Sequence, residues 1–344
     1  MPTSHADALE AAHRAVDAAN GVCRAVQQRL ADLRAITKDD KSPVTVADFA
    51  SQAVVAKCLA DDLGHGPDDL PLVGEEDAGF LRDPGHAAHL EAVVEAVRAV
   101  HHDLSADDVL TWVDAGTTEP GSDGFWTLDP IDGTKGFLRG QQYAVALGWI
   151  EDGSPMVGAM GCPNLPSAFD APLDTPDATG TVYLAIKGGG CREINPASGT
   201  PKPIARRDLG EGDPINICAS VEKAHTNVSD EDKILSHIVE TTEHAVGTPV
   251  RLDSQCKYAV TARGQADAYL RLPTRPGYIE RIWDHAAGAI IATEAGCTVT
   301  DIFGVPLDFG RGRGLEGNKG IVCAPPRVHT LVIDAIKQLG ITPA

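Results

Sequence analysis

The chain has 344 residues, a length that suits one large domain or two fused domains. Hydrophobic residues make up 43% of it, as in ordinary globular proteins, and 49 acidic against 29 basic residues give a formal net charge of −20. No long basic run occurs, so we expect neither a nucleic-acid partner nor an anionic membrane partner, because both require clustered Lys and Arg.

The first hundred residues show the apolar spacing of helices. Apolar residues recur every three to four positions over 5–35, which predicts a long amphipathic helix, and two further helices are predicted over 47–63 and 86–102. The polar segment 103–124 predicts a loop. The N-terminus lacks the basic and apolar regions of a secretory signal, and no apolar run could span a membrane. We therefore expect a cytoplasmic protein, with an organelle as the alternative.

Short apolar and aromatic segments in the middle of the chain predict strands at 125–128, 143–149 and 155–161. The Pro- and Asp-rich segment 163–180 predicts a loop and a candidate domain seam. Beyond it, segments typical of strands and of helices follow in turn. The predicted strands cover 181–186, 215–220, 268–272 and 297–301, and the predicted helices cover 230–243, 256–264 and 284–295. This order indicates layers of sheets and helices.

The eight cysteines are scattered and form no CxxC pair. This spacing disfavours a zinc ribbon or a thioredoxin-type site, and we expect free thiols.

The segment Asp-Pro-Ile-Asp-Gly-Thr carries two carboxylates, Asp129 and Asp132, just after a predicted strand. Its proline stops the strand and Gly133 permits a tight turn, so both carboxylates and the Ile131 carbonyl can converge on one point. Hard cations such as Mg²⁺ take oxygen ligands of this kind. Thr134 follows at a predicted helix N-terminus, where N–H groups favour phosphate. A turn with two solvated Asp residues is the alternative.

Three further acids stand in short segments that are ordinary when taken alone. Glu75 follows the apolar run Leu70–Val73, but Gly-Glu-Glu-Asp can also be an acidic surface turn. Asp284, in Trp-Asp-His-Ala-Ala-Gly, begins a predicted helix and can be only its cap. Asp48 is an early acid of the second helix.

In combination these segments resemble the inositol-monophosphatase superfamily of lithium-sensitive metal phosphatases. Its signature has an acid in GEE, then DPxDGT, then WDxAAG, and all three occur here in that order. The resemblance runs from about Ala8 to Leu331. It implies a layered α-β-α-β-α sandwich with an α+β part over 1–180, carrying most metal ligands, and an α/β part over 181–344.

Further strings resemble the 3'(2'),5'-bisphosphate nucleotidase branch of this superfamily. They are GTKGFLRG at 133–140, LDSQCKY at 252–258, YLRLP at 269–273 and VPLDF at 305–309. This branch implies hydrolysis of the 3'-phosphate of adenosine 3',5'-bisphosphate to AMP and phosphate, and action on the 5'-phosphosulfate analogue. The implied partner is thus a small molecule, and we expect a monomer.

The resemblance also implies two to three Mg²⁺ ions per site. Glu75, Asp129 and the Ile131 carbonyl would hold one ion, Asp129, Asp132 and Asp284 a second, and Glu75 a weaker third. A water on the first ion would attack the phosphorus in line, and the second ion would stabilise the leaving oxygen.

The catalytic pair implied by the resemblance is Thr134 with Asp48, which would orient and deprotonate the water. The implied substrate contacts are Thr134, His225, Ser254, Lys257, Arg271 and Asp284. Arg and Lys suit the second phosphate as a fork and as a mobile charge. Cys256 stands among these residues, so a thiol reagent is expected to affect activity.

Two alternatives stay open. One is an inositol monophosphate or polyphosphate phosphatase on the same fold. The other is a non-catalytic metal- or nucleotide-binding regulator, whose sign would be the loss of a ligand carboxylate or of Thr134. None of these residues is lost here.

Overall fold

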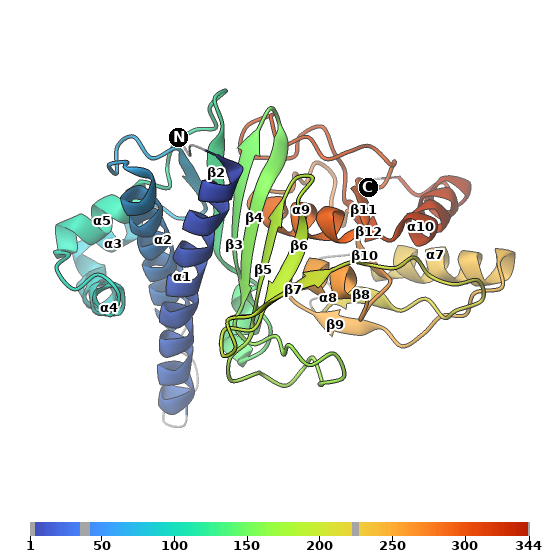
Figure 1. Ribbon diagram of the computed structural model, residues 1–344, viewed down its shortest axis with the longest axis horizontal. Coiled ribbons are helices and arrows are strands. Elements are labelled where there is room, and N and C mark those ends of the chain that lie inside the picture. Colours follow the sequence, from blue (N-terminus) through green and yellow to red (C-terminus); the bar gives the residue numbers. More distant parts are fainter. Residues whose placement is uncertain (1–3, 35–41, 222–226, 343–344) are drawn as a thin grey trace.

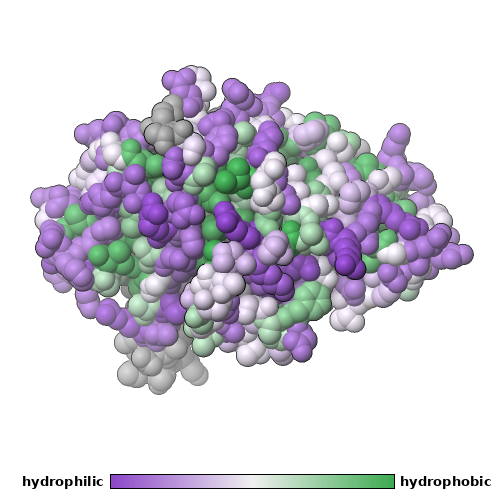
Figure 2. Space-filling model, in the orientation of Figure 1, coloured by the Kyte–Doolittle hydropathy of each residue, from purple (hydrophilic) through white to green (hydrophobic). Residues whose placement is uncertain are grey.

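The computed structural model describes residues 4–34, 42–221 and 227–342. Within these ranges, no helix combines the length and the apolar character needed to cross a membrane. The visible face of the molecule is mainly hydrophilic, with apolar residues scattered over it (Figure 2).

A seven-stranded sheet forms the centre of the molecule (Figure 1). Its first two strands are parallel and the others are antiparallel. In spatial order the strands are β1 (Leu72–Gly74), β2 (Phe125–Asp132), β3 (Ala144–Glu151), β4 (Ser154–Cys162), β5 (Thr181–Ile186), β6 (Gly190–Ile194) and β7 (Pro201–Ile204). The predicted seam at 180 lies between β4 and β5 of this one sheet, and the division into two domains stays a prediction.

Helices cover one face of the seven-stranded sheet (Figure 1). The long helices α1 (His5–Arg34) and α2 (Ser42–Leu63) pack on the sheet and on each other. Outside them lie α3 (Gly79–Arg82), the 3-10 helix η1 (Pro84–His86), α4 (Ala87–Arg98) and α5 (Ala106–Asp114). Most of the buried residues of α1 and α2 are alanine or valine, and such small side chains allow closely packed helices.

A five-stranded sheet forms a second layer, built from residues of the second half of the chain. In spatial order its strands are β11 (Thr298–Thr300), β12 (Ile321–Ala324), β10 (Ala268–Arg271), β8 (Ile217–Ser220) and β9 (Val250–Leu252). Helices α8 (Cys256–Arg263) and α9 (Ala286–Ala295) lie between the two sheets, and α7 (Val228–Thr241) and α10 (Pro326–Gln338) cover the outer face (Figure 1). The predicted α-β-α-β-α sandwich is therefore confirmed.

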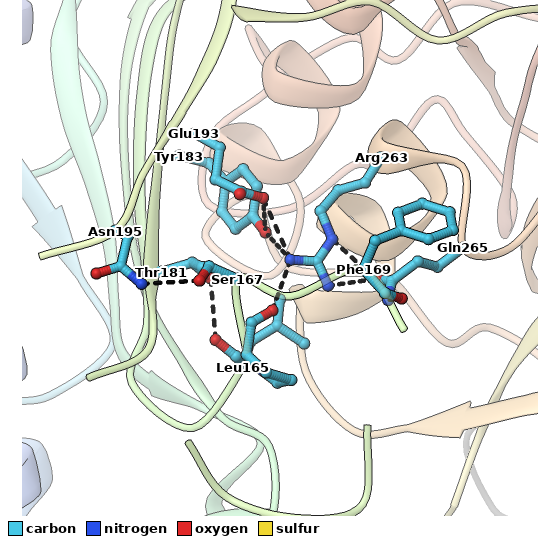
Figure 3. A network of polar contacts seen from close by, with 10 residues as sticks. Leu165, Ser167, Phe169, Thr181, Tyr183, Glu193, Asn195, Arg263 and Gln265 are labelled. Atoms are coloured by element: carbon cyan, nitrogen blue, oxygen red, sulfur yellow. Dashed lines mark hydrogen bonds and ion pairs between the residues drawn. The ribbon is translucent and has the colours of Figure 1, made fainter. Parts of the chain in front are cut away.

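A buried polar network joins α8 to the seven-stranded sheet (Figure 3). The Arg263 guanidinium donates to Glu193 Oε2 at 3.2 Å, to the Tyr183 hydroxyl at 3.0 Å and to the Pro166 carbonyl at 2.8 Å. The Tyr183 hydroxyl in turn donates to Glu193 at 2.9 Å. Because a buried ion pair needs such additional hydrogen bonds, this geometry fixes α8 against β5 and β6.

The loop predicted over 103–124 is wrong, because this segment contains α5. Ser105 and Asp108 form a reciprocal capping box at its start, and Val109, Trp112 and Val113 are its buried face. The helix predicted from Asp284 begins instead at Ala286, so Asp284 lies in the preceding turn and is not its cap. All eight cysteines lie in described parts of the chain and all are free.

Candidate active site

A cavity of about 300 Å³ collects side chains from both sheets and from the segments that follow their strands. Nine of the eleven predicted site residues line it: Glu75, Asp129, Ile131, Asp132, Thr134, Ser254, Lys257, Arg271 and Asp284. Residues that stand far apart in the sequence thus meet around one space. Asp48 lies outside this lining, and His225 lies outside the described residues.

The end of β2 presents its two carboxylates because the strand is irregular there. The pairing with β3 shifts between Asp129 and Asp132, so both side chains reach the cavity although they are three residues apart. The sequence analysis predicts that the proline between them stops the strand. This prediction is wrong, because Pro130 lies within β2, in its irregular stretch. The Ile131 N–H donates to Asp129 Oδ1 at 3.1 Å, which fixes that carboxylate.

The turn after β2 depends on a left-handed glycine. Gly133 has φ +86°, and a Cβ at this position would meet the Ser254 Cβ at 2.8 Å. Thr134 then begins the short helix α6 (Thr134–Arg139), as predicted, and its hydroxyl lies 3.4 Å from the Ile131 carbonyl as a donor. The Ile131 carbonyl therefore faces the same space as the Thr134 hydroxyl.

Glu75 reaches the cavity because β1 runs parallel to β2, with Gly74 opposite Leu128. The side chain of Gln52, from α2, holds the backbone that follows. Its amide donates to the Glu76 carbonyl at 2.6 Å and accepts from the Glu76 N–H at 3.1 Å. A Cβ on residue 74 would meet Gln52 Oε1 at 2.5 Å, which explains a glycine before Glu75.

Asp284 is positioned by a second buried amide, that of Gln255. The Gln255 side chain donates to the Trp283 carbonyl at 2.8 Å and accepts from the Gly288 N–H at 2.9 Å. The backbone N–H of the same residue donates to Asp132 Oδ2. Gln255 therefore ties the turn that carries Asp284 to the carboxylate of Asp132.

The clustered carboxyl groups disfavour their own ionisation. Burial, followed by the charges of Asp284, Glu76 and Asp132, raises the pKa of Glu75 to about 8. Burial and nearby acids likewise raise the pKa of Asp129 well above its usual range, and burial raises that of Asp284 to about 6. Asp132 is the fourth acid of this cluster. The four carboxyl groups form a donor set that fits a divalent cation, because the charge of the cation would offset the repulsion between the carboxylates.

Two cations, Lys257 and Arg271, also line the cavity. Arg271 is held by Glu280 as a two-pronged pair, with Nε at 2.8 Å from Oε1 and Nη2 at 2.7 Å from Oε2. Its Nη2 also lies 4.0 Å from Asp284 Oδ2. Lys257 is buried, which lowers the pKa of its ammonium, and its Nζ lies 5.3 Å from the centre of the Tyr269 ring. These two cations can bind an anion beside the carboxylates.

Glu280 and His285 lie close enough to Asp284 to suggest a further metal-ligand group. However, Arg271 engages both Glu280 oxygens, and the His285 ring lies 3.0 Å from the Tyr258 hydroxyl. We therefore assign these two residues to the support of Arg271 and of α9, which sequence reasoning did not find.

Asp48 is buried and does not line the cavity. It is 7% exposed, and burial, with the charges of Glu76 and Glu75, raises the pKa of its carboxyl well above the usual range. Cys256 is fully buried and its thiol contacts the Tyr143 carbonyl at 3.3 Å. A bulky thiol reagent cannot reach it in the folded protein, contrary to the sequence-based expectation.

Comparison with known proteins decides the family. The model of the inositol monophosphatase family matches residues 7–340. The chain belongs to the inositol monophosphatase family. Solved structures of SuhB from Mycobacterium tuberculosis and CysQ from Bacteroides thetaiotaomicron share its fold. The first has a TM-score of 0.60 at 21% identity and covers 98% of each chain. The second has a TM-score of 0.56 at 19% identity and covers 92% of this chain and 96% of its own.

Among curated relatives, a Schizosaccharomyces pombe protein named 3'(2'),5'-bisphosphate nucleotidase is 41% identical, over 88% of this chain and 85% of its own. An Arabidopsis thaliana protein named 3'(2'),5'-bisphosphate nucleotidase 1 is 40% identical, over 96% of this chain and 95% of its own. The predicted membership of the superfamily is thus confirmed, and members of this inositol monophosphatase family are generally metal-dependent.

Proposed function

We propose that this protein is a magnesium-dependent 3'(2'),5'-bisphosphate nucleotidase. It would hydrolyse the 3'-phosphate of adenosine 3',5'-bisphosphate to AMP and phosphate, and would also accept the 5'-phosphosulfate analogue. The observation that carries the proposal is one cavity lined both by the four carboxylates and by the cations Lys257 and Arg271. The names of relatives at about 40% identity over most of the chain support the choice of substrate.

The donor set of the cavity fits Mg²⁺, because its groups are carboxylate and carbonyl oxygens. We propose that two to three ions are held by Glu75, Asp129, the Ile131 carbonyl, Asp132 and Asp284. Such ions supply charge neutralisation at the transferring phosphoryl group and a more acidic water.

The chain's own residues would handle the proton and the substrate. The Thr134 hydroxyl would orient the attacking water, and Asp48 would accept its proton through that hydroxyl. Burial raises the pKa of the Asp48 carboxyl, which makes its ionised form a stronger base than an exposed carboxylate. Ser254, Lys257 and Arg271, together with His225, would hold the second phosphate and the nucleotide, and Glu280 keeps Arg271 oriented toward the cavity.

A phosphate-release assay with a substrate panel tests this function. Adenosine 3',5'-bisphosphate should be cleaved faster than 3'-AMP, and both faster than inositol 1-phosphate. Arg271→Gln should lower kcat/KM more with the bisphosphate than with 3'-AMP, because only the bisphosphate has a second phosphate for Arg271 to bind. Faster release from inositol 1-phosphate would favour the alternative inositol phosphatase.

Asp132→Asn separates an enzyme from a non-catalytic regulator. This variant should fold and lose most of its activity, and near-normal turnover would exclude the proposed ligand role of Asp132. Lithium ions should inhibit the wild-type enzyme, since a small monovalent ion in a magnesium site brings less charge. Insensitivity to lithium would count against the assignment.

A further inference from the structure

The loop Gly310–Gly314 carries two arginines in different surroundings. Arg311 is exposed and pairs at 2.6 Å with Asp308, which stands two residues before this loop. Arg313 is half-buried and turns the other way, toward segments that end in metal-ligand candidates. Neither arginine belongs to the motifs that indicate the proposed function, and the loop is remote in sequence from every carboxylate of the cavity except Asp284.

The Arg313 guanidinium contacts the backbone just before Glu75. Its Nη2 donates to the Gly74 carbonyl at 2.6 Å, which fixes the peptide group that joins Gly74 to Glu75. Its Nη1 lies 3.5 Å from the carbonyl of Thr118, in the segment that pairs with β1. Arg313 is therefore a donor to the end of β1 from a loop of the C-terminal half.

The same guanidinium stacks on the residue just before Asp284. Its Cζ lies 4.8 Å from the centre of the Trp283 ring, within the range of a cation–π contact. The loop is also tied by its backbone to the segment that leads into Trp283. The Ile282 N–H donates to the Arg313 carbonyl at 3.3 Å, and the Leu315 N–H donates to the Glu280 carbonyl at 2.8 Å.

One side chain thus touches both chain segments that supply Glu75 and Asp284. These two acids come from different layers and line the same cavity, where two ionised carboxylates repel each other. Without a cation this repulsion acts to separate them. A rigid planar fork that also stacks on an aromatic ring can hold the two segments at a set spacing, whereas a lysine cannot make both contacts.

We propose that Arg313 is a positioning residue that holds Glu75 and Asp284 at the spacing required for Mg²⁺ binding. The inference rests on the proposed metal-dependent function. It concerns the affinity of the site for the ion, and it assigns Arg313 no contact with substrate. Residues that orient metal ligands typically change metal affinity by about 10- to 100-fold when they are removed.

The test compares Arg313→Gln, Arg313→Lys and, as the matched control, Arg311→Gln in the same loop. Calorimetric titration of the chelator-treated protein with Mg²⁺ gives the affinity directly. The Mg²⁺ concentration for half-maximal phosphate release gives a second value. Arg313→Gln should weaken Mg²⁺ binding about tenfold or more, Arg313→Lys should lie between this variant and the wild type, and Arg311→Gln should match the wild type. At saturating Mg²⁺ the kcat of Arg313→Gln should return close to the wild-type value.

Urea denaturation in EDTA separates positioning from a purely structural role. If Arg313→Gln lowers stability in EDTA but binds Mg²⁺ with wild-type affinity, the proposal is overturned. If that variant does not fold, Arg313→Lys decides, and wild-type affinity in it overturns the proposal equally. If the wild type and Arg311→Gln themselves bind no Mg²⁺, the proposed function fails instead, so the two failures are distinguishable.

Discussion

Replacing Asp284 by Asn should stabilise the metal-free protein while it abolishes activity. Burial raises the pKa of the Asp284 carboxyl from its usual 3.8 to about 6, against the opposing charges of Arg271 and His285. Without a metal ion, the folded protein therefore holds this proton more tightly than the unfolded chain does. The free energy of unfolding consequently falls as the pH rises from 3.8 to about 6, and it stays lowered at higher pH.

The size of this effect follows from the two pKa values. Each factor of ten in proton affinity corresponds to about 1.4 kcal/mol, so the interval from 3.8 to about 6 corresponds to about 3 kcal/mol at pH 7.5 and to about half of that at pH 5. The Asp284 side chain is only 19% exposed, so solvent screens little of this electrostatic penalty. Asn has nearly the same shape and no charge, so it removes the penalty without leaving a cavity.

Urea denaturation in EDTA at pH 7.5 and pH 5 measures the prediction. The free energy of unfolding of Asp284→Asn should exceed that of the wild type by about 3 kcal/mol at pH 7.5, and by less at pH 5. The control Asp334→Asn, at an exposed position of α10, should match the wild type at both values. Added Mg²⁺ should then stabilise the wild type but not Asp284→Asn. If Asp284→Asn is no more stable than the wild type in EDTA at pH 7.5, the electrostatic reasoning is refuted.

Three further substitutions probe the support of the site. Gly74→Ala places a Cβ 2.5 Å from Gln52 Oε1, and this overpacking should lower the free energy of unfolding by about 1–3 kcal/mol in urea denaturation; wild-type stability would contradict the close approach. Gln255→Ala leaves the Trp283 carbonyl without its donor and should lower kcat/KM about tenfold or more in the phosphate-release assay; an unchanged kcat/KM would show that the amide does not hold this turn. Ser105→Ala removes the cap of α5 and should cost about 1 kcal/mol of stability in urea denaturation. Activity should be unchanged, because Ser105 does not line the cavity, and a loss of activity would contradict this expectation.

Much of the fold could be predicted from local patterns. The helix predicted over 5–35 corresponds to α1, and the three central strands correspond to β2, β3 and β4. The prediction fails at α5, where the acidic capping residues conceal a helix with a narrow buried face. Strands β6 and β7 were not predicted, because an edge hairpin with exposed positions shows little apolar alternation. Helix α10 had a readable signal in its initial proline and in the spacing of Val328, Val332 and Ala335.

The candidate site likewise contains residues that could be predicted from the sequence and residues that could not. The carboxylates and cations could be predicted because their segments, although mostly ordinary when taken alone, together resemble a known family. The residues that hold them could not, because Gln52, Gln255 and Arg313 act through contacts between segments remote in sequence. A glutamine on a helix and an arginine in a glycine-rich loop resemble surface residues until the fold brings their partners to them.

The central claim is that Glu75, Asp129, Asp132 and Asp284 together hold divalent cations against a phosphoryl group. Crystals grown with Mn²⁺ in place of Mg²⁺, and with AMP and phosphate, test it most directly through anomalous scattering. We predict at least two anomalous peaks in the cavity, both within coordination distance of Asp129, with the phosphate beside them. Full manganese-dependent activity in solution, combined with no peak among these four carboxylates, would contradict the account.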